Sequence, residues 1–264
     1  MNYFITTLAI GEPYFSKSLE MYINLHEKTV DGYFNITTSK QDLVSFSSIV
    51  GETLEDFLIK YPRLKITTVE DINKRFVFPL HMEGGGFTFN LNLKVLALKV
   101  VVERFLNSNH DCVIFIDGDW SIIPGFEEKK ILDLIEYLNN CDTDFLFERP
   151  APIEGGRVCP EQSFFREKLE DYKVTHTKWD TAHVVNEQFL VFKNNEKLNY
   201  FVQRWEQFLW YSIANNIRNY PDGFEIGISA LEADLKWEYW GVFSRFINDC
   251  FSFYTKTGDY HVRY

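Results

Sequence analysis

The regular alternation of strand-like and helix-like segments constrains this chain more than any other feature of its sequence. Three segments are rich in β-branched and aromatic side chains, as strands are: residues 3–10 (YFITTLAI), 32–39 (GYFNITTS) and 64–69 (LKITTV). Between them, residues 16–28 and 52–61 carry apolar side chains at helical spacing, with Ser16 as the expected N-cap of the first helix. This alternation predicts an α/β fold with a mainly parallel, Rossmann-like sheet and helices on both faces.

The next predicted strand ends in an acidic pair. A long apolar helix is expected over residues 91–106, and the run CVIFI (residues 112–116) is typical of a strand buried on both faces. Asp117 and Asp119 follow it directly, separated by one glycine. Open α/β sheets bind ligands just beyond the carboxyl ends of their strands, so the pair is expected at a ligand-binding edge.

The second half of the chain shows no linker that would separate an independent domain. Its expected regular elements are a helix over residues 127–140, strands over 144–149 and 186–194, and helices over 198–216 and 224–237. Residues 150–182 are expected to form a long loop with one short helix. Loops of that length in a compact domain are usually functional or disordered.

Charge and composition exclude several classes of function. The 264-residue chain has a formal net charge of -11, which argues against binding the phosphate backbone of a nucleic acid. Its cysteines are scattered with no CxxC pair, so a disulfide framework or zinc site is not expected. We see no signal-peptide pattern and no apolar run near the roughly 18 residues of a membrane helix. A cytoplasmic enzyme or binding domain is therefore expected.

The stretch Asp117-Gly118-Asp119 suits a divalent cation. Two carboxylates at positions i and i+2 can reach one cation if the backbone turns between them, and Gly118 permits the turn because it lacks a Cβ. Mg²⁺ and Mn²⁺ prefer oxygen ligands and commonly bridge to substrate phosphates. The two interpretations are a metal–diphosphate site and a solvated turn after a buried strand.

Four stretches together resemble the GT-A class of nucleotide-sugar glycosyltransferases, which carry a D-x-D motif after a buried strand. VIFIDGD (residues 113–119) supplies the motif. TTLAIGEPYF (6–15) resembles the first strand and the loop that cradles the nucleotide base. LNLKVLAL (91–98) resembles the helix before the D-x-D strand. NEQFLVFKN (186–194), with the helix containing Trp205, resembles the N-x-G-x-x-x-F strand and its following helix.

This resemblance implies a GT-A-like single domain over residues 1–264, with a nucleotide-sugar-binding half (1–123) and an acceptor-binding half (124–264). It also implies a metal-dependent glycosyltransferase. The donor would be a nucleotide-diphosphate sugar, with a UDP-sugar as first choice. The acceptor would be a hydroxyl group of a glycan or of another molecule.

The resemblance assigns metal ligands. Asp117 and Asp119 would hold Mn²⁺ or Mg²⁺ against the donor diphosphate, with Asp119 contacting the metal directly and Asp117 also reaching the ribose or sugar. His261, in GDYHVRY, is the candidate third ligand. The alternative for His261 is a residue of a frayed chain end.

Further donor contacts follow from the same likeness. Thr7 lies in the first strand of the nucleotide half, and Tyr14 is a candidate for stacking on the base. Lys94 would point toward the nucleotide sugar, and Lys256 toward a phosphate. Together with Asp117, these residues form the expected nucleotide-binding set.

Transfer also needs a group near the anomeric carbon of the sugar. A carboxylate there could remove the acceptor proton or stabilise the oxocarbenium-like transition state. Glu225 is the first candidate, Glu187 the second and Glu232 the third; the alternative for Glu225 and Glu232 is a charge on a helix surface. Trp179, in the long loop, is expected to face the acceptor by stacking on a sugar ring.

Two other functions remain open on the sequence. A haloacid-dehalogenase-like phosphohydrolase also places D-x-D after an apolar strand, with Asp117 as nucleophile and Ser121 where a threonine or serine is expected. That motif normally lies near the N-terminus, whereas three strand–helix units precede it here. The second alternative is a non-catalytic nucleotide-sugar-binding domain.

Overall fold

The computed structural model describes most of the chain: residues 1–11, 13–72, 93–105, 110–147, 185, 188–214, 222–239, 250–254 and 260–261. Within these ranges, only the backbone is described for a few residues at the ends of elements: 104–105, 212–214, 222, 224, 239, 252–254 and 260–261.

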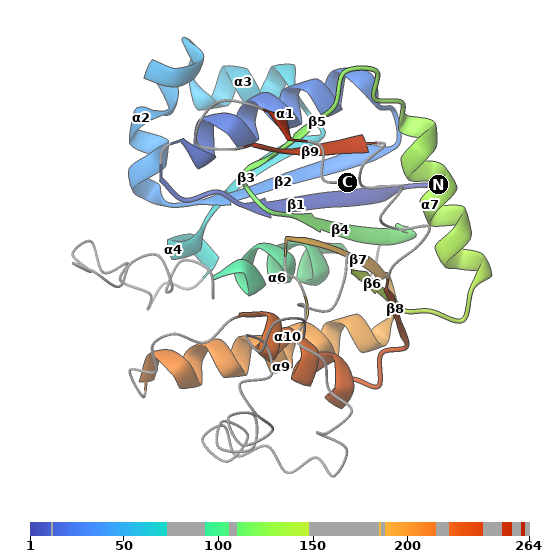
Figure 1. Ribbon diagram of the computed structural model, residues 1–264. Coiled ribbons are helices and arrows are strands. Elements are labelled where there is room, and N and C mark those ends of the chain that lie inside the picture. Colours follow the sequence, from blue (N-terminus) through green and yellow to red (C-terminus); the bar gives the residue numbers. More distant parts are fainter. Residues whose placement is uncertain are drawn as a thin grey trace.

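A seven-stranded sheet forms the centre of the molecule (Figure 1). Its strands are β1 (Tyr3–Leu8), β2 (Gly32–Thr38), β3 (Leu64–Thr68), β4 (Cys112–Ile116), β6 (Phe145–Phe147), β7 (Phe189–Lys193) and β8 (Trp237–Tyr239). Their spatial order is β3-β2-β1-β4-β7-β6-β8. Strands β1 to β4 are parallel, β7 is antiparallel to both its neighbours, and β8 is parallel to β6. The predicted mainly parallel α/β sheet is confirmed.

The strand order reverses between β1 and β4. The chain runs outward from β1 through β2 to β3 and then returns to form β4 on the other side of β1. Tyr3 pairs with Cys112 and Thr6 with Phe115, so the carboxyl ends of β1 and β4 lie next to each other. Such a reversal leaves a crevice outside the carboxyl ends of the two strands, where open α/β sheets bind ligands.

Helices cover both faces of the sheet. They are α1 (Tyr14–Lys28), α2 (Lys40–Val50), α3 (Leu54–Lys60), α4 (Val69–Ile72), α6 (Lys94–Phe105), α7 (Glu128–Asn140), α9 (Glu196–Ala214) and α10 (Asp222–Glu232). In Figure 1, α1 and α3 lie on one side and α6, α9 and α10 on the other. None of the helices in the described ranges is long and apolar enough to cross a membrane.

Two hydrophobic cores result from this layering. Alternate residues of β1 enter different cores: Ile5 packs with Phe15 of α1, whereas Phe4 packs with Leu96 of α6 and Trp205 of α9. All six residues of β1 and all five of β4 are buried. A strand covered on both faces needs apolar side chains at successive positions, which explains the unbroken run CVIFI.

A second, three-stranded sheet joins distant parts of the chain. It has the order β10-β9-β5 and consists of β5 (Trp120–Ile122), β9 (Phe251–Tyr254) and β10 (Tyr260–His261). Phe253 pairs with Trp120 on one side and with His261 on the other. The backbone of His261 is therefore two strands away from the residue that follows Asp119.

Two helix predictions were wrong. The helix expected over residues 224–237 ends at Glu232; Asp234 has a φ of 51°, and Trp237 begins β8. A non-glycine residue in the left-handed region cannot continue a right-handed helix. Ser16 is not the N-cap of α1, because that helix begins at Tyr14 and the Ser16 hydroxyl donates to the carbonyl of Pro13.

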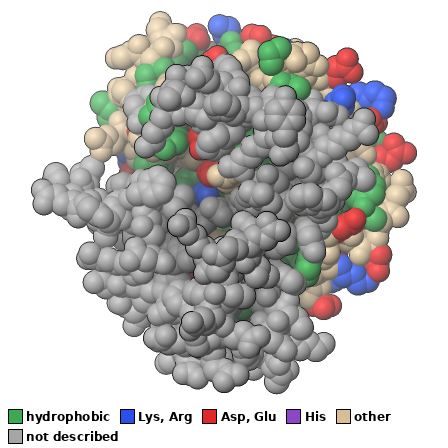
Figure 2. Space-filling model, in the orientation of Figure 1, with side chains coloured by type: hydrophobic (Ala, Val, Ile, Leu, Met, Phe, Trp, Pro, Cys, Tyr) green, Lys and Arg blue, Asp and Glu red, His purple; other side chains and the backbone are tan. Residues whose placement is uncertain are grey.

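The edge of the molecule formed by α7 carries charges of both signs, and Figure 2 shows acidic and basic side chains interspersed there. Lys129 and Asp133 form an ion pair of 2.5 Å, four residues apart on the same helix. Both side chains are more than half exposed, at 73% and 53%. Such pairs contribute little to stability because water screens them.

Candidate functional site

The acidic pair lies in a turn fixed by the backbone at the carboxyl end of β4. The amide of Asp117 donates to the carbonyl of Gln188, 2.9 Å away, just before β7. The amide of Trp120 then donates to the carbonyl of Asp117 at 3.2 Å, which closes the turn before β5. The turn is therefore anchored to the neighbouring strand on one side and leads directly into the second sheet.

Gly118 lets this turn approach the end of β1. A Cβ atom at Gly118 would lie 2.8 Å from the carbonyl oxygen of Leu8 and 3.4 Å from Ala9 Cα. The hydroxyl of Ser18, on α1, donates to the Gly118 carbonyl at 3.3 Å. The turn itself does not require a glycine here, because Gly118 has no positive φ. Close packing against β1 is the physical reason for a glycine here.

Lys94 and Asp117 form a largely buried ion pair. Lys94 is the first residue of α6, and its ammonium nitrogen lies 3.0 Å from Asp117 Oδ2. The two side chains are 2% and 18% exposed. A buried ammonium group is costly unless it is paired, so Asp117 stabilises the charge on Lys94, and the contact fixes the position of the Asp117 carboxylate.

Tyr14 lies within the electrostatic influence of both carboxylates. It is the first residue of α1 and is half-buried. Burial raises the pKa of its phenol above the ordinary value, and the negative charges of Asp119 and then Asp117 raise it further. The structure thus brings together four of the predicted residues: Tyr14, Lys94, Asp117 and Asp119.

The loop between β1 and α1 is tied to the adjacent end of β2 by Asp42, a residue that the sequence analysis missed. The amide of Gly11 donates to both carboxylate oxygens of Asp42 at 3.1 Å. The same carboxylate accepts from Thr38 Oγ1 and from the Ser39 amide, forming a capping box for α2. The signal was present, because Ser39-Lys40-Gln41-Asp42 has the S-x-x-D spacing of an N-terminal cap.

Glu225, the first candidate for catalysis, is fully buried near the start of α10. The start of this helix docks closely on the chain before β7. The amide of Val185 donates to the Gly223 carbonyl at 3.0 Å, and a Cβ at Gly223 would lie 2.0 Å from the Val185 carbonyl oxygen. Val185 precedes Gln188, the partner of Asp117, by three residues. The start of α10 and the acidic pair thus dock on the same short stretch of chain.

Within the described part of the chain, the structure does not bring the other predicted side chains to the acidic pair. Thr7 is fully buried within β1, and Glu232 pairs with Arg204 on α9 instead of facing the acidic pair. For His261 the structure describes the backbone, which lies in β10. Trp179, Glu187 and Lys256 lie outside the described residues.

The acidic pair supplies oxygen ligands suited to a hard cation. No group of three or more histidine, cysteine, aspartate or glutamate side chains able to hold a metal occurs in the described part of the chain. Asp117 and Asp119 are two carboxylates, which is the number that commonly binds Mg²⁺ together with substrate phosphates. The two carboxylates therefore fit a cation that takes its remaining ligands from a bound diphosphate.

Comparisons with known proteins found likenesses among solved structures, with 327 matching chains. A scan against protein-family models and a search of curated proteins found no match. Among solved structures, the chain is similar to that of the galactosyltransferase LgtC, solved in complex with donor and acceptor sugar analogues. The TM-score is 0.45 and the sequence identity 12%, over 90% of this chain and 72% of the other.

Proposed function

We propose that this protein is a metal-dependent glycosyltransferase that transfers a sugar from a nucleotide-diphosphate sugar to a hydroxyl acceptor. The observation that carries the proposal is the acidic pair at the β1–β4 reversal, with Asp117 held by the buried ammonium group of Lys94. That crevice is where α/β sheets of this topology bind nucleotides. The GT-A resemblance of the sequence points to the same residues.

In this proposal Asp117 and Asp119 hold Mn²⁺ or Mg²⁺, with His261 as the third ligand. The cation would offset the charge that develops on the leaving diphosphate. Lys94 orients Asp117 through their ion pair, and Lys256 adds a positive charge at a phosphate.

The nucleotide base is proposed to lie against the loop between β1 and α1. Tyr14, at the end of that loop, would stack on the base, and Thr7 would contribute from β1. Asp42 supports this assignment, because its hydrogen bonds to the Gly11 amide hold the loop in one position without a ligand. A loop already held in its binding conformation loses less entropy when the nucleotide binds. The donor is proposed to be a UDP-sugar.

The acceptor side is proposed to involve Glu225, with Glu187 as the second candidate for the catalytic carboxylate and Trp179 as an acceptor platform. Glu225 is the first choice because it is fully buried near the start of α10, which docks on the same stretch of chain as the acidic pair. We propose a cytoplasmic location on the basis of the unpaired cysteines. The described ones, Cys112, Cys141 and Cys250, are free, as is usual in a reducing compartment.

The test is a thermal-shift panel of UDP, GDP and CMP, each with and without Mn²⁺, followed by UDP release from UDP-sugars. We expect UDP with Mn²⁺ to raise the melting temperature by several degrees, because a ligand that binds only the folded state stabilises it. Asp119→Ala should abolish both the shift and the release. Asp133→Ala, which removes an exposed carboxylate on α7, is the matched control and should change neither.

Three results would contradict the proposal. The first is the absence of stabilisation by any of the nucleotides in the presence of metal. The second is phosphatase activity through a phosphorylated Asp117, which would favour the phosphohydrolase. Metal-dependent nucleotide binding without turnover of any donor would favour the non-catalytic binding domain.

A further inference from the structure

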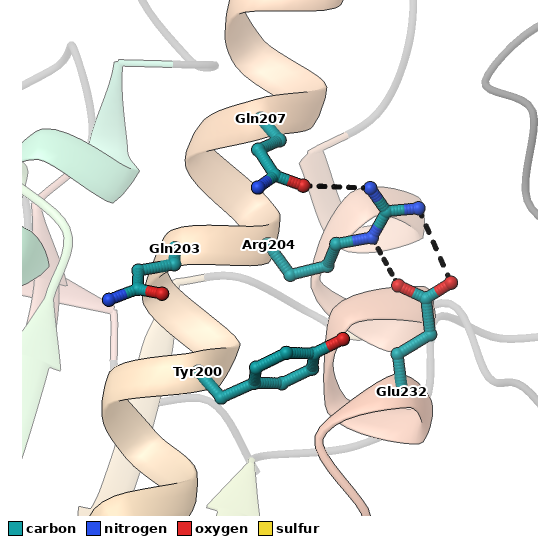
Figure 3. Close-up of a pocket in the computed structure, with 5 residues that line it drawn as sticks. All are labelled: Tyr200, Gln203, Arg204, Gln207 and Glu232. Carbon is teal, nitrogen blue, oxygen red and sulfur yellow. Dashed lines mark hydrogen bonds and ion pairs between the residues drawn. The ribbon is translucent and has the colours of Figure 1, made fainter.

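A small polar pocket lies between α9 and α10, apart from the site described above. It encloses ≈ 160 Å³ and is lined by Tyr200, Gln203, Arg204, Gln207 and Glu232. The first four belong to one face of α9, since they are three, four and seven residues apart, and Glu232 is the last residue of α10. In Figure 3, Tyr200, Arg204 and Glu232 lie between the two helices and Gln207 reaches Arg204, whereas the side chain of Gln203 extends away from α10 in this view.

One side of the pocket is a rigid array of planar polar groups. Arg204 makes a two-point contact with the carboxylate of Glu232, through Nε and through a terminal nitrogen at 3.3 Å (Figure 3). Another terminal nitrogen of Arg204 donates to the Gln207 amide oxygen at 2.9 Å. The guanidinium carbon also lies 4.5 Å from the centre of the Phe208 ring. These contacts fix the planes of the guanidinium, carboxylate and amide before any ligand arrives.

The other side of the pocket is an exposed aromatic ring. Tyr200 is 51% exposed, so one face of its ring is open to a ligand. Gln203 is one turn further along the same helix; its amide nitrogen donates to Asn199 Oδ1 at 3.4 Å, which leaves one donor and the amide oxygen for a ligand. An exposed ring beside planar hydrogen-bonding groups can stack on an apolar face while it bonds the polar rim of the same ligand.

The charges select a neutral ligand. Arg204 is the positive group of the pocket and Glu232 the negative one, and they neutralise each other. An anionic ligand would have to compete with the Glu232 carboxylate for the guanidinium, whose donors already engage Glu232 and Gln207. Sugar hydroxyls both donate and accept, so they suit the remaining capacity of amide, carboxylate and phenol groups without disturbing the ion pair.

The pocket lies at the other end of α10 from the part that approaches the acidic pair. Gly223, which docks on Val185, and Glu232 are nine residues apart along this helix, or about 14 Å. A ligand of the size of the pocket cannot reach both ends. The pocket is therefore separate from the candidate catalytic centre.

We propose that the pocket formed by Tyr200, Gln203, Arg204, Gln207 and Glu232 is a carbohydrate-binding site for a neutral sugar residue of a glycan, distant from the catalytic centre. Tyr200 stacks on the sugar ring, and Gln203 and Gln207 bond its hydroxyls. Arg204 and Glu232 shape the pocket through their ion pair.

The test measures binding of neutral oligosaccharides by saturation-transfer NMR and titration calorimetry. The probes are maltohexaose, cellohexaose, xylohexaose and mannohexaose, each added to the full chain in EDTA and without nucleotide. We expect at least one of them to bind with millimolar or tighter affinity. Tyr200→Ala should weaken that binding at least tenfold, and Gln203→Ala several-fold.

The controls separate this site from the catalytic one. Tyr33→Ala removes another partly exposed tyrosine, on β2, and should leave oligosaccharide binding unchanged. Asp119→Ala should also bind the oligosaccharide like the wild type, even though it loses nucleotide-dependent activity. The inference is wrong if none of the four oligosaccharides binds, or if Tyr200→Ala binds as well as the wild type. Neither result would bear on donor binding, which is measured separately with nucleotides and Mn²⁺.

Discussion

Carboxylates at the two ends of the central sheet make different contacts. At the amino end, Glu128 accepts hydrogen bonds from the Tyr3 hydroxyl and from the amides of Val30 and Asp31, so it joins α7 to the starts of β1 and β2. At the carboxyl end, Asp117 and Asp119 stand together beside Tyr14 and the buried Lys94.

The comparison distinguishes a carboxylate that holds the fold together from the two carboxylates of the candidate site. A carboxylate that bonds donors from several elements stabilises the fold and is satisfied where it is. Two carboxylates in one turn repel each other, and a nearby cation offsets that repulsion. Lys94 supplies one positive charge, and we propose that a divalent metal supplies more.

The largest loss of stability is expected from a substitution at the carboxyl end of the sheet. Lys94→Ala should lower the free energy of unfolding by about 3 kcal/mol, because it breaks a buried ion pair and leaves a cavity under α6. Urea unfolding measures this change. The control Lys129→Ala breaks an exposed pair and should leave stability unchanged within error. Equal effects of the two substitutions would remove the distinction between a buried and a surface pair.

A smaller loss of stability is expected from a substitution at the amino end of the sheet. Glu128→Gln should lower the free energy of unfolding by about 2 kcal/mol, because it weakens charge-assisted hydrogen bonds to two backbone amides. Nucleotide binding at the opposite end should stay within twofold of the wild type. Parallel urea unfolding and calorimetric titration with UDP and Mn²⁺ measure the two quantities. A large loss of nucleotide affinity would show that the two ends are coupled.

The smallest effect is a pH dependence at Asp144, also at the amino end. Burial alone would raise the pKa of this carboxyl group. Hydrogen bonds from the Lys236 amide, Lys197 and Asn195 outweigh burial and leave the pKa below the ordinary value of 3.8. Asp144 therefore contributes stability above the unfolded-state pKa, and that contribution disappears as the pH falls through the folded-state pKa.

Asp144→Asn tests this directly. The stability difference between wild type and Asp144→Asn should be constant from pH 7 to about pH 5 and should shrink as the pH falls below 3.8. Urea unfolding at a series of pH values measures it. A difference that stays constant across the whole range would mean that the charge of Asp144 is not what its hydrogen bonds stabilise.

The strands that carry the site were predictable from local sequence. β1, β2, β3 and β4 follow runs of β-branched and aromatic residues, and the predicted limits of the last, residues 112–116, match the structure. The position of Asp117 and Asp119 after a buried strand followed from the same pattern. These features are local, since they depend on which side chains fit a strand covered on both faces.

The sequence by itself therefore determined the parallel half of the sheet and the edge where the acidic pair lies. The tertiary structure decided the rest: that β7 is antiparallel, that β9 and β10 pair beside β5, and that Lys94 meets Asp117. The Tyr200 pocket also depends on two helices meeting. Each of these contacts joins residues far apart in the chain, and local composition does not specify which distant partner lowers the free energy most.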